Sequence, residues 1–288
     1  MMKNLSITAK YIYKLMFICM LTGGAFYGFA ASDDVGHIDD SPRSIGFELI
    51  DGLIVVKASY GGVSGHFVLD TGAPTSLINQ KVRHSEFQLW SPKGSHKGAE
   101  VTIADFSFGM ISKSSLDVWA MDLSFLEQQL DHDIDGIIGN DIWENHQVII
   151  NYANQEITFH HKGDAMSIHP DQYDIASVPW KVLTDELRTI TLQINGEEKY
   201  MAFDTGAGIN VLHESEGNQQ IDFGQAQMEH VVINQVPFIT SDLSVLMEQA
   251  GKDAIDGIIS PYSLKADIII LDFSNERVHV CWKKVSSS

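Results

Sequence analysis

The sequence has few groups that could cross-link the chain or bind a polyanion. It contains two cysteines, Cys19 and Cys281, and only 19 lysines and arginines against 38 acidic residues, so the formal net charge is −19. No basic cluster stands out, which makes nucleic acid a poor partner. Cys19 lies in a segment that we expect to be removed. Cys281 alone cannot form an intramolecular disulfide, so the mature fold must be held by packing.

The patterns of a metal or cofactor site are also missing. The chain has 12 histidines, but no His-Glu-x-x-His motif and no paired-cysteine spacing. Gly61, Gly62 and Gly65 lie between two strand-like runs, and no helix start follows them, so a hairpin turn explains them better than phosphate binding. We therefore expect neither a cofactor nor a metal.

The first 30 residues have the composition of a secretory signal peptide. Lys3, Lys10 and Lys14 precede an apolar run from Leu15 to Phe29 that ends in small residues. We predict a cleaved signal over residues 1–30, a short acidic lead over 31–43, and an exported protein that is periplasmic or secreted. Cleavage removes three lysines and no acid, which takes the net charge to −22. The alternative is an uncleaved membrane anchor, because residues 15–31 approach the length of a membrane span.

An internal duplication is the most informative feature of the chain. Three segments recur in the same order: residues 67–73 at 201–207, residues 134–138 at 255–259, and residues 148–152 at 269–273. The first pair is offset by 134 residues and the other two by 121. The second copy is therefore shorter by 13 residues, all lost between the Asp-Thr-Gly and the Asp-Gly segments.

The secondary structure that the sequence predicts is mainly β. Strand-like runs rich in β-branched and aromatic residues are bounded by turn-forming clusters. Together with the duplication, this predicts two homologous β-barrel-like lobes related by a pseudo-twofold axis, at residues 44–162 and 178–284, with a polar linker at 163–177. The strands expected are 47–56, 66–69, 101–108, 147–152, 189–194 and 267–273, with a short helix at 123–130.

The repeated Asp-Thr-Gly is the motif that could supply catalytic carboxylates. In each copy an apolar strand delivers an aspartate, Asp70 or Asp204, to its end, and the glycine allows a backbone N–H to approach the carboxylate. A pseudo-twofold axis would bring the two carboxylates face to face. Two carboxylates in contact share one proton, so one can activate water while the other donates to a carbonyl oxygen. Asp135 and Asp256 also recur, but each precedes a glycine, and we expect them to form turns.

The motif Asp-Thr-Gly-Ala, followed about 70 residues later by two apolar residues and glycine, resembles the pepsin and retropepsin group of aspartic peptidases. The single-chain duplication resembles the bilobal pepsins, whereas the short lobes and the alanine after each glycine resemble retropepsins. The strand at 147–152 resembles the continuation seen in bacterial retropepsin-like proteins. The resemblance implies the acid-protease fold and peptide-bond hydrolysis by a monomer acting on polypeptides. It implies Asp70 and Asp204 as the catalytic pair. The supporting residues would be Thr71, Gly72, Thr205 and Gly206.

Two departures from that pattern keep alternatives open. Ser260 stands where lobe 2 should have a glycine, and no tyrosine occurs between Tyr60 and Tyr152 to make the flap contact typical of pepsins. We expect one flap, from lobe 1, within about residues 91–104. The alternatives are a non-catalytic peptide-binding module of the cell envelope and a membrane-tethered peptidase.

Overall fold

The computed structural model of the chain describes most of the sequence from residue 44 onward. The described residues are 44–82, 87–91, 94–164, 168–183, 187–217, 220–244, 247 and 255–284, together with a two-residue strand, β1 (Met20–Leu21). The rest of the predicted signal peptide and the acidic lead lie outside the described residues. Among those that are described, none forms a helix long and apolar enough to cross a membrane.

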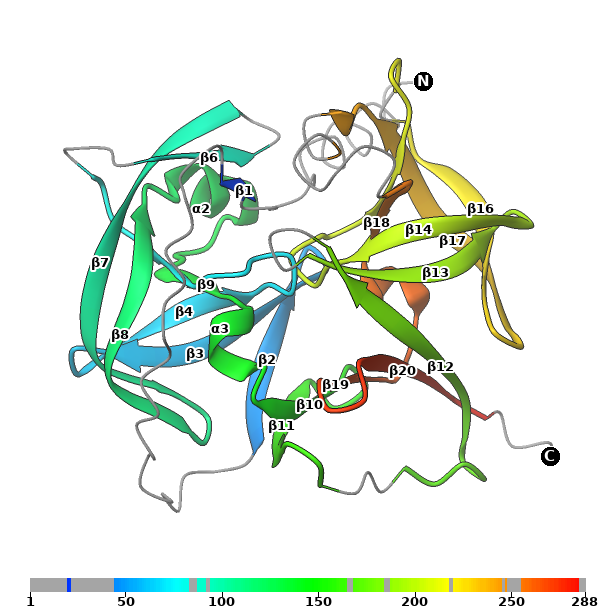
Figure 1. Ribbon diagram of the computed structural model, residues 1–288, viewed down its shortest axis with the longest axis horizontal. Helices are drawn as coiled ribbons and strands as arrows, with labels where there is room; N and C mark the ends of the chain where they lie inside the picture. Colours follow the sequence, from blue (N-terminus) through cyan, green and yellow to red (C-terminus); the bar gives the residue numbers. More distant parts are fainter. Residues whose placement is uncertain are drawn as a thin grey trace.

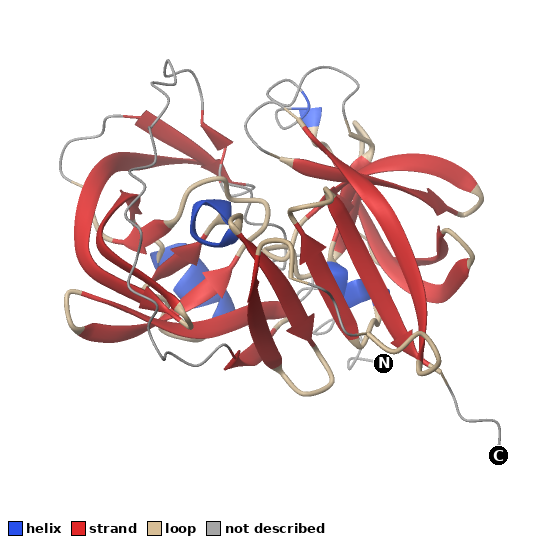
Figure 2. Cartoon of the chain, turned by 60° about the horizontal axis from the view of Figure 1, so that its bottom comes forward, coloured by secondary structure: helices blue, strands red, loops and turns tan. Residues whose placement is uncertain are grey.

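The molecule consists of two β lobes side by side, joined by a shared sheet (Figure 1). Figure 2 shows that strands dominate both lobes and that the helices are short. This confirms the predicted fold class. The elements of lobe 1 are β3 (Leu53–Tyr60), β4 (Val63–Leu69), β5 (Leu77–Asn79), β6 (Phe87–Ser91), β7 (Gly94–Phe108), β8 (Ile111–Met121), α2 (Ser124–Leu130), β9 (Gly136–Ile138) and α3 (Asn140–Trp143). Those of lobe 2 are β13 (Arg188–Ile194), β14 (Glu197–Phe203), β15 (Asn210–His213), β16 (Asp222–Met228), β17 (Val231–Ser241), β18 (Gly257–Ile259) and the 3₁₀ turn η2 (Pro261–Leu264).

Each lobe repeats the same unusual strand pairing. The strand that leads into Asp-Thr-Gly runs parallel to the strand that follows Asp-Gly: β4 pairs with β9, and β14 pairs with β18. The next strand pairs parallel to the second arm of a long hairpin, as β5 does with β8 and β15 with β17. The sequence repeat is therefore a repeat of topology, which generates the pseudo-twofold relation.

The shared sheet contains three strands from each half. Its order is β2 (Ser44–Ile50), β11 (Glu156–His161), β10 (His146–Asn151), β19 (Ile268–Asp272), β20 (Arg277–Lys283) and β12 (Tyr173–Val182), all antiparallel. The two halves meet at β10 and β19, where Ile149 pairs with Ile270. These two residues are equivalents in the sequence repeat, so the pseudo-twofold axis passes between them.

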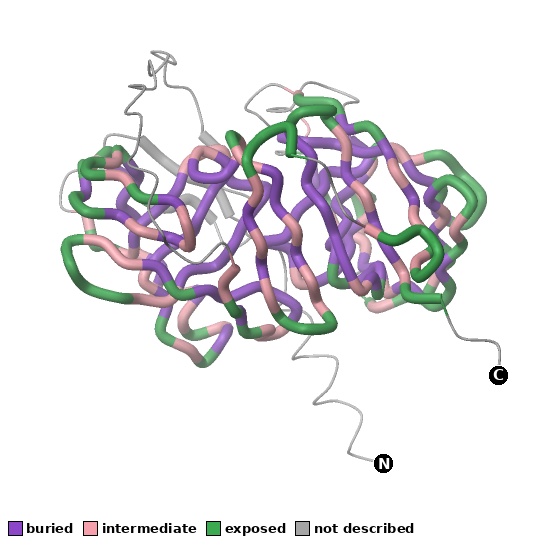
Figure 3. The backbone as a smooth tube through the Cα atoms, turned by 90° about the horizontal axis from the view of Figure 1, so that it is seen from below, coloured by how far each residue is buried: buried purple, intermediate pink, exposed green. Residues whose placement is uncertain are grey.

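The apolar core follows the duplication as well. One large cluster runs through both lobes and the shared sheet, and each lobe adds a smaller cluster under its Asp-Thr-Gly loop. The small clusters contain equivalent residues, such as Val68 with Ala202 and Leu123 with Leu243. Figure 3 shows the buried chain in the interior of both lobes and the exposed chain at the peripheral turns. Burial of these matched strands fixes the two loops at corresponding places.

Two sequence predictions need correction. The run 47–56 is two strands, because Asp51 and Gly52 both have positive φ (53° and 89°) and form a tight turn between β2 and β3. The predicted linker 163–177 overlaps β12, which begins at Tyr173. Alternate residues of this polar stretch, Ala176 and Val178, are buried as it pairs with β20. By contrast, the hairpin turn predicted at Gly61-Gly62 is confirmed between β3 and β4.

Candidate active site

The two Asp-Thr-Gly loops meet back to back and exchange hydrogen bonds through their threonines. The Thr71 N–H donates to Thr205 Oγ1 (2.9 Å), and the Thr205 N–H donates to Thr71 Oγ1 (3.0 Å). Each hydroxyl in turn donates to the strand of the opposite lobe, Thr71 to the Phe203 carbonyl and Thr205 to the Leu69 carbonyl, both at 2.8 Å. All four groups are buried, so water does not compete for these bonds. The threonines therefore fix the two loops relative to each other.

The same loops orient the two aspartates. Gly72 donates its N–H to Asp70 Oδ1, and Gly206 donates to Asp204 Oδ1, both at 2.7 Å. The glycines also allow close approach across the axis. A Cβ added to Gly72 would lie 2.9 Å from the Asp204 carboxyl carbon, and one added to Gly206 would lie 2.4 Å from that of Asp70. Each carboxylate is thus held by its own loop and packed against the glycine of the other.

The electrostatics of the pair follow from this arrangement. Both aspartates are fully buried, and the second oxygen of each, Oδ2, has no hydrogen-bond partner among the described residues. Burial and the neighbouring Asp204 charge raise the pKa of Asp70 well above its ordinary value. Burial raises the pKa of Asp204 to about 6. The two titrate as a unit, and over a range of pH the pair holds one proton.

The recurring Asp135 and Asp256 do not join this pair. Asp135 Oδ2 accepts from the His66 N–H, and Asp256 Oδ2 accepts from the Tyr200 N–H, both at 2.8 Å. Each aspartate also donates its own N–H back to the same residue's carbonyl. They therefore hold the middle of the strands that deliver Asp70 and Asp204, a structural role at an equivalent place in each lobe.

The flap predicted within residues 91–104 is part of a hairpin, which β6 forms with the first residues of β7. The pairing runs from Phe87 with Gly98 to Ser91 with Gly94. The hairpin starts at Phe87, before the predicted range, and its action as a flap stays a prediction. Figure 1 places this hairpin at the end of lobe 1 that is remote from the shared sheet. Lobe 2 has only residues 214–221 between β15 and β16 at the corresponding place.

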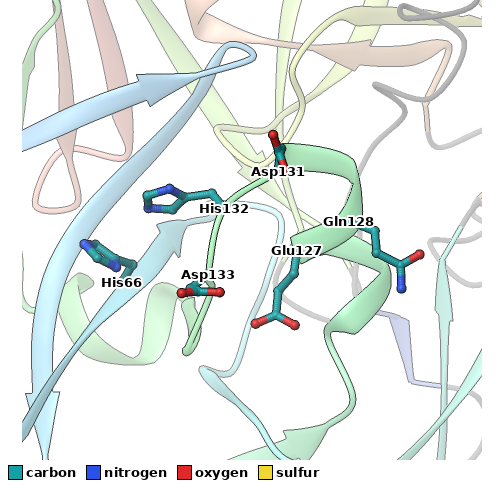
Figure 4. Close-up of a pocket in the computed structure, with 6 residues that line it drawn as sticks. All are labelled: His66, Glu127, Gln128, Asp131, His132 and Asp133. Atoms are coloured by element: carbon teal, nitrogen blue, oxygen red, sulfur yellow. The ribbon is translucent and has the colours of Figure 1, made fainter.

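A second group of polar side chains lies on lobe 1, away from the aspartate pair. A cavity of about 460 Å³ is lined by six residues, His66, Glu127, Gln128, Asp131, His132 and Asp133 (Figure 4). The His66 and His132 rings meet edge to face with centroids 4.8 Å apart. Within the part of the chain that the structure describes, no three or more His, Cys, Asp or Glu side chains are arranged to hold a metal ion. Neither Asp70 nor Asp204 lines this cavity.

Comparison with known proteins identifies the fold. No protein-family model matches the sequence, and no curated protein matches it. Among solved structures, the chain is similar to an aspartic proteinase from Irpex lacteus, with a TM-score of 0.56, 12% identity, and coverage of 85% of this chain and 98% of that one. It is also similar to the basic 7S globulin from soybean, with a TM-score of 0.51, 9% identity, and coverage of 82% and 94%.

At these identities the likeness shows the fold alone, which is the bilobal acid-protease fold of pepsin-like proteins. One neighbour is described as a proteinase and the other as a globulin, so the fold does not decide the activity. Any functional conclusion has to come from the two loops that carry Asp70 and Asp204.

Proposed function

We propose that this protein is an aspartic endopeptidase that hydrolyses peptide bonds with a water molecule activated between Asp70 and Asp204. The observation that carries the proposal is the buried pair of carboxylates, each held by its own loop and packed against the glycine of the opposite loop. Such a pair keeps one proton at a pH where isolated aspartates would both be ionised. It can therefore act as acid and base in the same step.

The reaction needs only that shared proton and water. Asp204, the ionised member, takes a proton from water as the water oxygen bonds to the substrate carbonyl carbon. Asp70, the protonated member, donates to the carbonyl oxygen, which leaves a neutral gem-diol. Asp204 then protonates the amide nitrogen as the C–N bond breaks, and one hydroxyl returns its proton to Asp70. The products are a carboxylic acid and an amine, and the pair is back in its starting state.

Single substitutions of the two aspartates test the proposal. Asp70→Asn and Asp204→Asn should each lower kcat/KM on a peptide library by about a thousandfold. Either change replaces one of the two carboxyl groups, so the pair can no longer supply both an acid and a base. Asp171→Asn, at an exposed turn between the halves, is the matched control and should keep full activity. A statine-type transition-state analogue should inhibit the wild type. Full turnover by either active-site variant would contradict the mechanism.

The pH dependence gives a second test. Activity should fall as pH drops below about 6, because the second carboxylate then takes up a proton and no base remains. It should also fall at high pH, when the pair loses its single proton. A bell-shaped profile of kcat/KM would report these two steps as properties of the pair.

A non-catalytic peptide-binding module is the second candidate. It is favoured by Ser260, which replaces the glycine of lobe 1 and buries a hydroxyl with no partner among the described residues. Incubation with a denatured protein from acid to neutral pH separates the two functions. Binding without cleavage over that whole range would favour the module.

We further propose that the protein acts outside the cytoplasm as a monomer, with polypeptide as its partner and without cofactor or metal. The proposal rests on the signal-like composition of residues 1–30. N-terminal sequencing of the exported protein should find a start near residue 31. An intact Leu15–Phe29 segment would instead show a membrane-tethered form, and with it a different site of action. We also propose, from the sequence resemblance described above, that the protein is related to bacterial retropepsin-like proteins.

A further inference from the structure

The start of helix α3 lies directly against the Asp-Thr-Gly loop of lobe 1. The Asn140 N–H donates to the Ala73 carbonyl, and its side-chain amide donates to the Thr71 carbonyl, both at 2.9 Å. The Gly139 N–H donates to Ser76 Oγ at 3.0 Å. These bonds join the chain after β9 to the first and last parts of the loop that begins at Asp70.

Asp141 completes this set of contacts. Its Oδ1 accepts from both the N–H and the hydroxyl of Ser76, at 3.0 and 2.8 Å, and its own N–H donates to the Pro74 carbonyl at 3.3 Å. The side chain is only partly exposed, and burial raises the pKa of Asp141 to about 6. At neutral pH an ionised acceptor therefore holds the end of the Asp70 loop, and hydrogen bonds to a charged acceptor are stronger than neutral ones.

Lobe 2 lacks this arrangement at the equivalent place, where Ser260, Pro261 and Tyr262 follow β18. Pro261 has no N–H to donate, and Tyr262 carries no carboxylate. In the described part of lobe 2, the one hydrogen bond from this segment to the loop after Asp204 runs from the Ser260 N–H to Asn210 Oδ1, at 2.7 Å.

The residue after β9 in lobe 1 and the residue after β18 in lobe 2 also pack differently. A Cβ added to Gly139 would lie 2.8 Å from the Ala73 carbonyl oxygen, so α3 and the loop touch backbone to backbone. Ser260 carries a Cβ at this position, and its buried hydroxyl has no partner among the described residues. At the position that follows β9 and β18, backbone contact of this closeness is therefore found in lobe 1 and not at Ser260.

We propose that Asp141 is a positioning residue that holds the Asp70 loop rigid through Ser76, so that lobe 1 supplies the fixed half of the aspartate pair and lobe 2 the adaptable half. The inference rests on the proposed function. A loosened loop would misplace a carboxylate that must reach both water and substrate, and a misplacement of about 1 Å costs roughly a hundredfold in rate. Substrate contacts made elsewhere would be unaffected, so the loss should appear in kcat.

Three variants test the proposal. Asp141→Ala removes the acceptor and should lower kcat by about 10- to 100-fold with KM changed by less than about threefold. Asp141→Asn keeps an oxygen at the Oδ1 position and should restore most of the activity. Asn210→Ala removes the Ser260–Asn210 bond of lobe 2, together with the bond from Asn210 to the Pro237 carbonyl, and should lower kcat less than Asp141→Ala does. Wild-type kcat in Asp141→Ala, no rescue by asparagine, or an equal loss from Asn210→Ala would each overturn the proposal.

Amide hydrogen exchange separates this inference from the proposed function, because it requires no turnover. Exchange of the Gly72 and Ser76 amides should be at least about tenfold faster in Asp141→Ala than in the wild type, and near wild type in Asp141→Asn. If the wild type cleaves nothing, the proposed function fails, and unchanged exchange would then overturn the positioning role too. Should Asp141→Ala not fold, Ser76→Ala removes the same hydroxyl contacts and should show the same two effects more weakly.

Discussion

Lobe 1 and lobe 2 share the strand pairing and the loop that place an aspartate, and they differ in the segments that cover and brace that loop. In both, an apolar strand ends in Asp-Thr-Gly, a recurring aspartate holds the middle of that strand, and a threonine reaches across the axis. Among the described residues, only lobe 1 has the β6–β7 hairpin and the polar contacts of Asn140 and Asp141. The duplicated chain has therefore kept the features that a carboxylate pair requires of both halves and has lost the rest from one half.

Among the changes that compare the two lobes, the largest effect should come from the glycines that both lobes share. Gly206→Ala forces the Asp70 carboxyl group to move, because the new Cβ would lie 2.4 Å from its carbon, and Gly72→Ala displaces Asp204 less, from 2.9 Å. We expect loss of at least about a hundredfold in kcat/KM for both, with Gly206→Ala the worse.

Gly46→Ala is the control for the glycine variants, because a Cβ there meets nothing closer than 3.8 Å. It should behave as wild type in peptidase assays and in thermal unfolding. Equal tolerance of alanine at residues 46, 72 and 206 would contradict the packed pair of carboxylates.

The hairpin difference should give the next largest effect. Replacing residues 88–97 of lobe 1 by a two-residue turn leaves the Phe87–Gly98 pair to close a shorter hairpin. This should lower kcat/KM by about 10- to 100-fold, because water exclusion and substrate contacts over the site would be lost. Shortening residues 215–220 of lobe 2 should cost less than about threefold. Equal losses at matched melting temperatures would indicate that both lobes cover the substrate.

Stability should depend on pH through a group that only lobe 1 has. The pKa of Asp141 is raised to about 6, so between about pH 4 and 6 the native state binds more protons than the unfolded state. The free energy of unfolding therefore falls as pH rises through this range. Asp141→Asn should remove a part of this fall on the order of 1–3 kcal/mol, as measured by denaturant unfolding at pH 4.5 and 7.5. An identical pH dependence in variant and wild type would show that Asp141 titrates normally.

The smallest effect concerns the residue that distinguishes lobe 2. Ser260→Ala removes a buried hydroxyl that has no partner among the described residues, so it should raise the free energy of unfolding by up to about 1 kcal/mol. The reciprocal change, Gly139→Ala, should destabilise lobe 1, because its Cβ would meet the Ala73 carbonyl at 2.8 Å. Destabilisation by Ser260→Ala would indicate that the hydroxyl has a bound partner such as water.

The sequence predicts the repeated features best, and it also predicts the Gly61-Gly62 turn, but it does not predict the polar contacts that brace the Asp70 loop. Asp70, Asp204 and the two-lobed fold follow from motifs that recur at fixed offsets. The contacts of Asn140 and Asp141 join residues 65 to 69 positions apart and belong to no periodic pattern. One signal was present, because Asn-Asp after β9 stands where the second copy has Pro-Tyr. The Asp51-Gly52 turn was missed because apolar residues continue on both sides of it.

The seam between β10 and β19 has a consequence for assembly. Each half of the shared sheet is built from strands of one lobe, and the chain passes from one half to the other only between His161 and Tyr173. The two halves therefore meet like the subunits of a dimer but are joined in one chain, and short linkers of this kind give effective concentrations in the millimolar range. Two separate fragments, cut at that connection, would need comparable concentrations to associate to the same extent as the two halves of the intact chain. The covalent link thus keeps the two halves associated even where their sequences have diverged.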